Sequence, residues 1–143
     1  MSLAIRAVTA ADVAEWLRMR RVLLPDDPGH DAEARDYFAR SRRECVTLVA
    51  ERRGGGLAGF VEVGSRGFAE GCDSQPVAYI EGWYVEPDLR RRGVADWARA
   101  AGFRELGSDA EVANEASQAA HRAVGFAEVV RIVCFRRALT EPA

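Results

Sequence analysis

Three cysteines, two histidines and a formal net charge of −2 give this chain of 143 residues little of what metal sites, disulfide frameworks and nucleic-acid interfaces need. Cys45, Cys72 and Cys134 match no metal-ligand spacing, and an odd number of cysteines is a poor disulfide framework. A chain without basic excess lacks the surface that binds phosphate backbones. No apolar run approaches the ~18 residues of a membrane span, and the first residues do not resemble a secretory signal. We therefore expect no metal, no nucleic acid and no membrane, and the reducing cytoplasm as compartment.

What the chain does contain is ordinary for a globular protein. Hydrophobic residues make up 48% and charged residues 29% of the sequence. The length predicts one domain over residues 1–143. Cys45 and Cys134 stand in apolar runs, which indicates small core residues.

Apolar periodicity predicts the secondary structure. We expect helices at 10–23, 31–43, 94–101 and 114–124, and strands at 3–8, 45–51, 57–63, 77–85, 104–108 and 127–135. The three glycines at 54–56 predict a hairpin, whereas the alternation of strands and helices in the second half predicts parallel pairing. The fold class is therefore α/β (α+β), with a mixed, mostly antiparallel sheet flanked by helices.

A basic, glycine-containing loop follows the strand at 77–85. It reads Arg90-Arg91-Arg92-Gly93-Val94-Ala95 and stands before a predicted helix, where backbone N–H groups can hold an anion. Gly93 permits close approach of a pyrophosphate, and the arginines supply positive charge. A basic surface turn is the alternative interpretation of the loop alone.

The surroundings of this loop resemble the GNAT acetyltransferases. The stretch Y-I-E-G-W-Y-V-E-P-D-L-R-R-R-G-V-A is similar to the family's strand and pyrophosphate loop, and N-E-A-S-Q-A-A-H-R-A-V-G-F to its second signature. The resemblance implies the GNAT fold, in which the strands at 77–85 and 104–108 run parallel and splay apart around acetyl-CoA. It assigns cofactor contacts to the loop and to further positions: Val85, Asn114 and Ser117.

A narrower resemblance concerns the substrate. G-C-D-S-Q-P-V-A-Y-I-E-G and S-D-A-E-V-A-N-E-A-S are similar to stretches of the aminoglycoside 6'-N-acetyltransferases, a group associated with antibiotic resistance. This implies an acetyl-CoA-dependent N-acetyltransferase that acts on the 6'-amino group of an aminoglycoside. A GNAT acting on a polyamine or a protein N-terminus, and a non-catalytic CoA-binding interaction protein, remain as alternatives.

Amine acetylation needs a proton acceptor, a substrate anchor and a proton donor for the leaving thiolate. The resemblance places Asp109 as acceptor, Glu81 as substrate anchor and His121 as donor. The corresponding alternatives are a turn aspartate, an outward-facing strand residue and a helix-surface histidine. Asn114 and Ser117 could equally be helix caps.

Further residues could contribute to the substrate mouth. Phe68 and Asp73 are candidate substrate contacts, and Trp83 is a candidate wall, with the core favoured for Trp83. Scattered acids could line the mouth or simply face solvent: Asp26, Asp27, Asp31, Glu70 and Glu111.

Two features depart from the family pattern. The helix after Ala95 is about two turns shorter than is typical, so either the chain carries a deletion or residues are missing from the sequence. Val130 stands where the aminoglycoside group can have an acidic residue. Finally, the family resemblance and the apolar stretch 129–135 predict a homodimer, because an uncovered apolar strand is adhesive.

Overall fold

The computed structural model describes residues 3–39, 45–86 and 98–139. These residues belong to two compact units, 1–109 and 110–143, each of which is described by itself.

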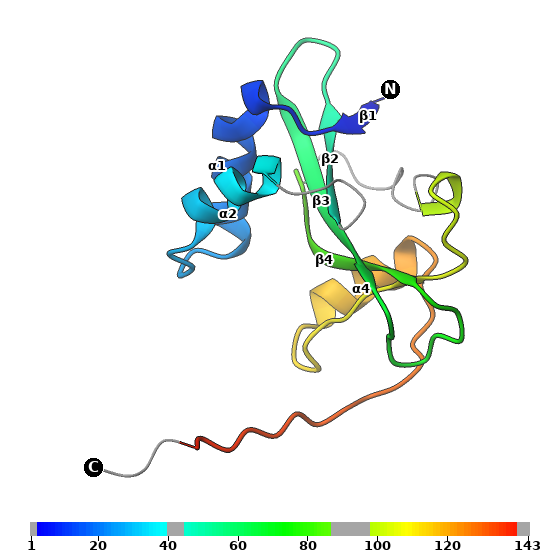
Figure 1. The fold of residues 1–143 in the computed structure, drawn as a ribbon. Coiled ribbons are helices and arrows are strands. Elements are labelled where there is room, and N and C mark those ends of the chain that lie inside the picture. Colours follow the sequence, from blue (N-terminus) through cyan, green and yellow to red (C-terminus); the bar gives the residue numbers. More distant parts are fainter. Residues whose placement is uncertain (1–2, 40–44, 87–97, 140–143) are drawn as a thin grey trace. The chain divides into compact units, whose positions relative to one another are not determined.

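The first unit contains a five-stranded sheet in the order β1-β2-β3-β4-β5 (Figure 1). The strands are β1 Ala4–Ala7, β2 Cys45–Glu51, β3 Leu57–Arg66, β4 Val77–Val85 and β5 Leu106–Gly107. Neighbours from β1 to β4 pair antiparallel, and β4 pairs parallel with β5. This confirms the mixed sheet and its parallel pair.

The parallel pairing is short. It is confined to Ala78↔Leu106 and Tyr79↔Gly107, although β4 continues to Val85. The strand predicted at 104–108 is thus reduced to two residues, whereas β3 extends three residues beyond its predicted end at Val63.

A bulge interrupts the pairing of β3 with β4. Glu62 pairs with Gly82, but the next residue, Val63, pairs with Ile80. Glu81 is therefore the extra residue of β4 and lies opposite no single partner. Bulges of this kind redirect side chains and are common beside active sites.

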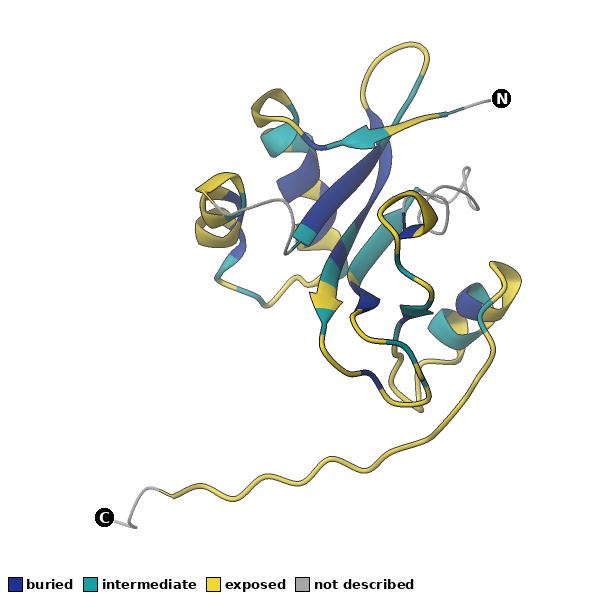
Figure 2. Ribbon diagram, turned by 45° about the vertical axis from the view of Figure 1, so that its right-hand side comes forward, coloured by how far each residue is buried: buried dark blue, intermediate teal, exposed yellow. Residues whose placement is uncertain are grey.

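Two helices pack on one face of this sheet (Figure 1). A short 3-10 turn, η1 Ala10–Asp12, leads into α1 Val13–Leu23, and α2 His30–Ala39 follows. The Thr9 backbone N–H donates to the Asp12 carboxylate at 2.8 Å and so forms one half of a capping box. The core combines residues from both layers (Figure 2): Val8, Trp16, Leu17, Met19, Ala34, Val49, Leu57 and Phe60.

The second unit contains one helix, α4 Glu115–Ala123, among the residues described. Asn114 caps it by accepting a hydrogen bond from the Ser117 backbone N–H at 3.0 Å. Gly125, with φ of 95°, follows the helix and adopts the left-handed conformation that favours glycine.

The strand predicted at 127–135 is wrong. Residues 127–139 form neither helix nor strand, and their side chains are exposed (Figure 2). Phe135 is 93% exposed, and Cys134 is exposed too, which corrects its assignment to the core. An apolar pattern alone does not make a strand, because a strand exists only where a neighbour completes its hydrogen bonds.

Several predictions fall partly or wholly outside the described residues. The helix predicted at 31–43 is described only as far as Ala39. Of the helix at 94–101, residues 98–100 are described and helical, and Gly102 follows with φ of 88°. The missing turns after Ala95 lie outside the described range. No helix within the described ranges is both long and apolar enough to cross a membrane.

Candidate active site

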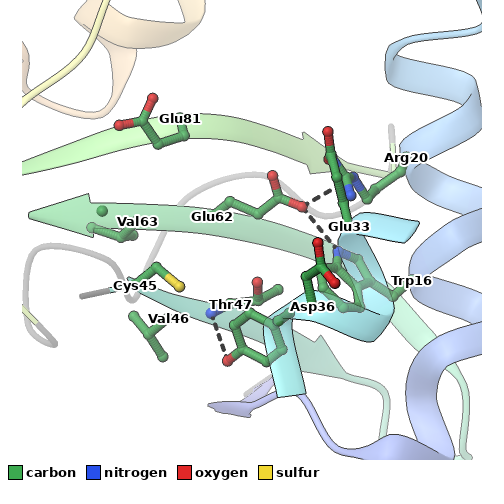
Figure 3. Close-up of a pocket in the computed structure, with 12 residues that line it drawn as sticks. Trp16, Arg20, Glu33, Asp36, Cys45, Val46, Thr47, Glu62, Val63 and Glu81 are labelled. Atoms are coloured by element: carbon green, nitrogen blue, oxygen red, sulfur yellow. Dashed lines mark hydrogen bonds and ion pairs between the residues drawn. The ribbon is translucent and has the colours of Figure 1, made fainter. Parts of the chain in front are cut away.

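An acidic cavity of about 250 Å³ opens in the first unit between the two helices and the sheet (Figure 3). Its described lining carries four carboxylates, those of Glu33, Asp36, Glu62 and Glu81, against one guanidinium, that of Arg20. The remaining lining residues are Trp16, Tyr37, Cys45, Val46, Thr47, Val63 and Gly64. The volume is close to the lower end for small-molecule sites, and the excess negative charge favours a cationic ligand.

Arg20 is a buried, positively charged residue in the lining of this cavity. It is 6% exposed and forms ion pairs with Glu33 and Glu62, the latter at 3.1 Å. The indole N–H of Trp16 donates to the same Glu62 carboxylate at 3.2 Å (Figure 3). These contacts hold the Glu62 side chain in place, since a buried carboxylate needs partners.

Burial raises the pKa of Glu62, against the opposing effects of Arg20 and the Trp16 hydrogen bond. Because burial disfavours the charged form of this carboxyl group, a further positive charge that enters the cavity would stabilise the carboxylate. The Glu62 carboxylate is therefore held in a fixed position, and its negative charge favours the binding of a cation in the cavity.

Sequence reasoning missed Glu62, although a signal was present. Glu62 interrupts the apolar run of β3 in the same way as Glu81 interrupts β4. Glu33 and Asp36 carried no comparable signal, because α2 is rich in charged residues along its whole length.

Glu81 lies at the rim of the cavity and already has a partner. Its carboxylate accepts two hydrogen bonds from Arg66, from Nε at 2.9 Å and from an Nη atom at 2.7 Å. Both side chains are about 40% exposed. Glu81 therefore faces outward, as the alternative interpretation expected, and also forms part of the cavity wall.

Asp109 is connected to the same group of residues through Tyr79. The guanidinium of Arg66 lies 3.5 Å from the ring centroid of Tyr79, within cation–π range. Burial, and next the charge of Asp109, raise the pKa of Tyr79, whose hydroxyl also hydrogen-bonds with Asp109. The structure thus brings Glu81 and Asp109 together through Arg66 and Tyr79, neither of which the sequence analysis singled out.

His121 belongs to the second unit, where it is buried in α4 with 9% exposure. Its Nδ1 atom lies 2.7 Å from the Ser117 backbone oxygen, and its ring packs edge-on against Phe126. A carbonyl oxygen can only accept, so Nδ1 carries the hydrogen. Of the residues predicted in this helix, Asn114 serves as the cap and Ser117 is the residue that it caps.

The loop 67–76 carries Phe68 and Asp73. Phe68 is 64% exposed, and the Asp73 backbone N–H donates to the Glu105 carboxylate at 2.8 Å. Glu105 also accepts from the backbone and hydroxyl of Ser74, both at 2.6 Å. The hydrogen bonds from Ser74 lower the pKa of Glu105, which anchors the loop next to β5. Trp83 is half-buried.

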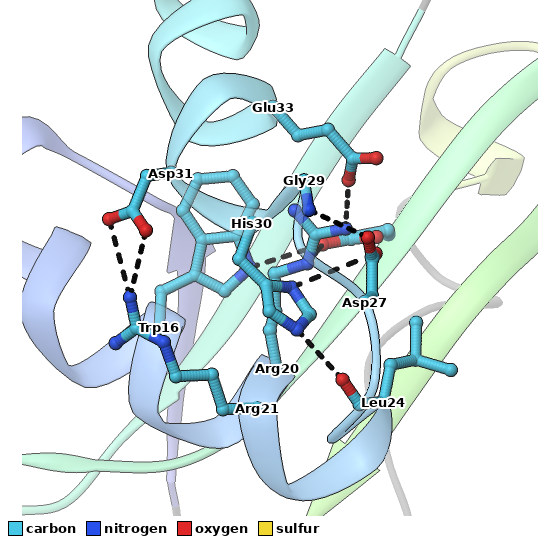
Figure 4. A network of polar contacts seen from close by, with 10 residues as sticks. Trp16, Arg20, Arg21, Leu24, Asp27, Gly29, His30, Asp31 and Glu33 are labelled. Atoms are coloured by element: carbon cyan, nitrogen blue, oxygen red, sulfur yellow. Dashed lines mark hydrogen bonds and ion pairs between the residues drawn. The ribbon is translucent and has the colours of Figure 1, made fainter.

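Two of the acids that could line the mouth or face solvent have partners in the connection between α1 and α2 (Figure 4). Asp27 accepts from the Gly29 backbone N–H at 2.8 Å, and Asp31 pairs with Arg21 at 3.1 Å. His30, 3% exposed, contacts the Leu24 carbonyl through Nε2 at 2.8 Å. These residues shape the connection between α1 and α2.

The predicted pyrophosphate loop, Arg90 to Ala95, lies outside the described residues, and Val85 is the last residue of β4 before it. Within the described ranges, no group of three or more His, Cys, Asp or Glu side chains could hold a metal ion.

The chain is similar to a well-defined set of known proteins. The sequence model of the acetyltransferase (GNAT) family matches residues 11–126. An aminoglycoside N(6')-acetyltransferase type 1 of Klebsiella aerogenes is 40% identical over 146 residues, covering 94% of this chain and 96% of the relative. The enzyme of the same description from Stenotrophomonas maltophilia is 39% identical over 144 residues, covering 94% and 93%.

Solved structures show the same relationship. An aminoglycoside antibiotic 6'-N-acetyltransferase of Acinetobacter baumannii superposes with a TM-score of 0.86 at 29% identity, covering 97% of this chain and 100% of that one. AAC(6')-Iy, in complex with the bisubstrate analogue CoA-S-monomethyl-acetylneamine, superposes with a TM-score of 0.83 at 30% identity, covering 96% and 99%.

Proposed function

Because the chain belongs to the acetyltransferase (GNAT) family, we propose that it transfers the acetyl group of acetyl-CoA to the 6'-amino group of an aminoglycoside. The observation that carries the substrate class is the acidic cavity, whose described lining has four carboxylates and one guanidinium, while a second guanidinium, that of Arg66, pairs with Glu81. A polycationic amino sugar loses its hydration on binding, and these carboxylates offset that cost.

Bound acetyl-CoA would supply an activated thioester. On this chain, Asp109 would hold the reacting ammonium and accept its proton, directly or through water. Glu81 and Glu62 would anchor neighbouring ammonium groups of the substrate. Much of the rate would come from positioning, because the amine and the thioester must meet in one orientation.

His121 would return a proton to the leaving sulfur. Its Nδ1–H donates to the Ser117 carbonyl, which fixes the orientation of the ring. Because Nδ1 is engaged with this carbonyl, Nε2 is the ring nitrogen that would carry the proton to the sulfur.

The described residues fit a CoA co-substrate where they can be tested. Beyond Tyr79, β4 is no longer paired with β5, although it continues as a strand to Val85. We assign the pyrophosphate to the loop of Arg90, Arg91, Arg92, Gly93, Val94 and Ala95, on sequence grounds. Asn114 and Ser117 remain candidate contacts, and Phe68 and Asp73 remain candidate substrate contacts.

Turnover measured on a panel of amines tests the proposal. Kanamycin should be acetylated in preference to spermidine and to peptides with free N-termini. Preference for spermidine or a peptide would favour a GNAT acting on another amine. Binding of acetyl-CoA without turnover on any amine would favour a non-catalytic CoA-binding protein.

We further propose that residues 1–143 act as one acetyltransferase domain, because the family match extends across both compact units.

A homodimer is supported by the exposed apolar segment 129–135, since such a segment is stabilised when covered. Its large members are Val129, Val130, Ile132, Val133 and Phe135. The free cysteines Cys45, Cys72 and Cys134 support a reducing cytoplasm.

A further inference from the structure

Arg66 is bound to the Glu81 carboxylate, to which an ammonium group of the proposed substrate would also bind. It is the last residue of β3, and its guanidinium engages both oxygens of Glu81, at 2.9 and 2.7 Å. This two-point arrangement matches a planar guanidinium to a planar carboxylate. Both oxygens of Glu81 are therefore already bound to a cation before any ligand arrives.

The backbone makes this pairing possible. Glu81 is the extra residue at the bulge of β4, so its side chain is not constrained to lie opposite one residue of β3. A Cβ atom at Gly64 would lie 3.2 Å from the Glu81 carboxylate, which shows that the carboxylate lies over this glycine. The absence of a side chain at Gly64 lets Glu81 extend along β3 towards Arg66.

The same guanidinium is connected through Tyr79 to Asp109, the second proposed amine-binding carboxylate. It lies over the ring of Tyr79 at 3.5 Å, and Tyr79 hydrogen-bonds with Asp109. Arg66 thus lies within the group of residues that contains both carboxylates, as a cation supplied by the chain itself.

We propose that Arg66 sets the affinity of the site for amines: its guanidinium is the resident cation that a substrate ammonium group displaces from Glu81. This inference rests on the proposed function. Binding then exchanges one cation for another: the ion pair between Glu81 and Arg66 is lost, and an ion pair between Glu81 and the ammonium group replaces it. The Arg66–Glu81 pair is half-exposed, and pairs of that kind contribute little, which makes displacement feasible.

The exchange has a consequence for turnover. An aminoglycoside keeps its other ammonium groups after acetylation, so an unopposed Glu81 would continue to hold the product. With Arg66 present, the carboxylate regains its own partner when the product leaves. Release of product is often the slow step of an enzyme, and a competing internal cation accelerates it.

Calorimetry with kanamycin tests the exchange on the full chain. Arg66→Gln removes the charge and keeps a hydrogen-bonding side chain of similar reach. We expect this variant to bind kanamycin about two- to fivefold more tightly, as expected for loss of a competing exposed pair. The matched control is Arg53→Gln, which removes the same charge from the exposed hairpin at the opposite end of β3 and should change the affinity much less.

The Glu81→Gln background separates exchange from general electrostatics. If Arg66 acts through Glu81, adding Arg66→Gln to the Glu81→Gln variant should change its affinity for kanamycin little. Weaker or unchanged binding by Arg66→Gln would overturn the proposal, because Arg66 would then position Glu81 or have no role. Equal tightening in both backgrounds would overturn it as well.

The turnover of kanamycin by the unmodified chain is measured in parallel. Binding without turnover would contradict the proposed function while the exchange is still read from the affinities. Turnover with an unchanged affinity in Arg66→Gln would contradict the exchange alone. If the unmodified chain neither binds nor acetylates kanamycin, both proposals are wrong.

Discussion

The ring of Tyr79 packs directly against Gly107, where the parallel strands β4 and β5 meet. A Cβ atom at position 107 would lie 2.8 Å from Cδ2 and 3.0 Å from Cε2 of this ring. Contacts this short are not tolerated, so Tyr79 keeps its position only because residue 107 has no side chain. Tyr79 in turn contacts both Arg66 and Asp109.

Gly107→Ala should therefore displace Tyr79 and disturb the site. Overpacking of a buried position costs about 1–3 kcal/mol, so we expect a lower melting temperature and a lower kcat/KM for the amine. Gly67→Ala is the matched control, because a Cβ atom there meets nothing within 4 Å. Full activity and unchanged stability of Gly107→Ala would show that Tyr79 relocates freely.

Asp109 and Glu81 should differ in their kinetic effects. Asp109→Asn should lower kcat and kcat/KM together, because it removes the proton acceptor. Glu81→Gln should chiefly raise KM for the amine and leave KM for acetyl-CoA nearly unchanged. Charge-assisted hydrogen bonds contribute roughly 1.5–3 kcal/mol, so each loss should exceed about tenfold.

Steady-state kinetics with a 6'-amino aminoglycoside measure both variants. Near-normal kcat/KM in both would mean that these carboxylates serve packing or face solvent. The assignment of the cofactor would survive that result, but the proposed amine mechanism would not.

The affinity for the amine should depend on pH through Glu62. Burial raises the pKa of Glu62 above its ordinary value, so protonation removes its negative charge at a higher pH than for an exposed glutamate. KM for the amine should therefore rise as the pH falls through this raised pKa. The same raised pKa means that Glu62 contributes to the stability of the fold at low pH. This contribution is lost as the pH rises through the raised pKa.

The pH profile of KM in Glu62→Gln provides the comparison. This variant cannot ionise at position 62, so the part of the profile due to Glu62 should vanish and KM should be raised at neutral pH. Arg20 keeps Glu33 as an ion-pair partner in this variant, and circular dichroism checks that the variant is folded. Identical profiles in both proteins would exclude Glu62 from amine binding.

Gly93→Asp should abolish binding of acetyl-CoA in a chain that stays folded. A carboxylate at this position of the proposed pyrophosphate loop would repel the phosphates and block their approach to the backbone. Calorimetry measures the affinity, and Gly67→Asp introduces the same charge at an exposed glycine as a control. Unchanged affinity in Gly93→Asp would rule out this loop as the phosphate site.

The chain should be a homodimer at micromolar concentration, as measured by light scattering. Val133 is 77% exposed within the apolar segment 129–135, so Val133→Asp should shift the protein towards monomer. Val112→Asp changes an equally apolar, 61% exposed residue outside the segment and should leave the dimer intact. A monomeric unmodified chain would contradict the prediction.

Most of the sheet and the helices could be predicted from sequence because their signals are local. The strand at 77–85 has the predicted bounds, and the three glycines at 54–56 close the hairpin between β2 and β3. Glu81 was identifiable because a charge inside an apolar run is costly unless it has a purpose. Glu62 carried the same signal in β3, so this part of the cavity was also within reach of sequence reasoning.

Contacts between distant segments were not predictable in this way. Arg66 is an unremarkable arginine at the end of a strand, and its pairing with Glu81 depends on a bulge that shifts the register of β3 against β4. Glu33 and Asp36 join the cavity only because α2 packs beside β2 and β3.

The stretch 127–135 shows the boundary between the two kinds of information most clearly. Its Val- and Ile-rich pattern determines that the segment can become a strand, and its exposed apolar side chains follow from the same composition. Whether it is a strand depends on a partner that completes its hydrogen bonds. Sequence determined the chemistry of each side chain, the local periodicity and the family of this protein. Tertiary structure alone decided which carboxylates meet, which cation opposes them and which apolar segment stays uncovered, because those outcomes depend on register and packing between residues far apart in the chain.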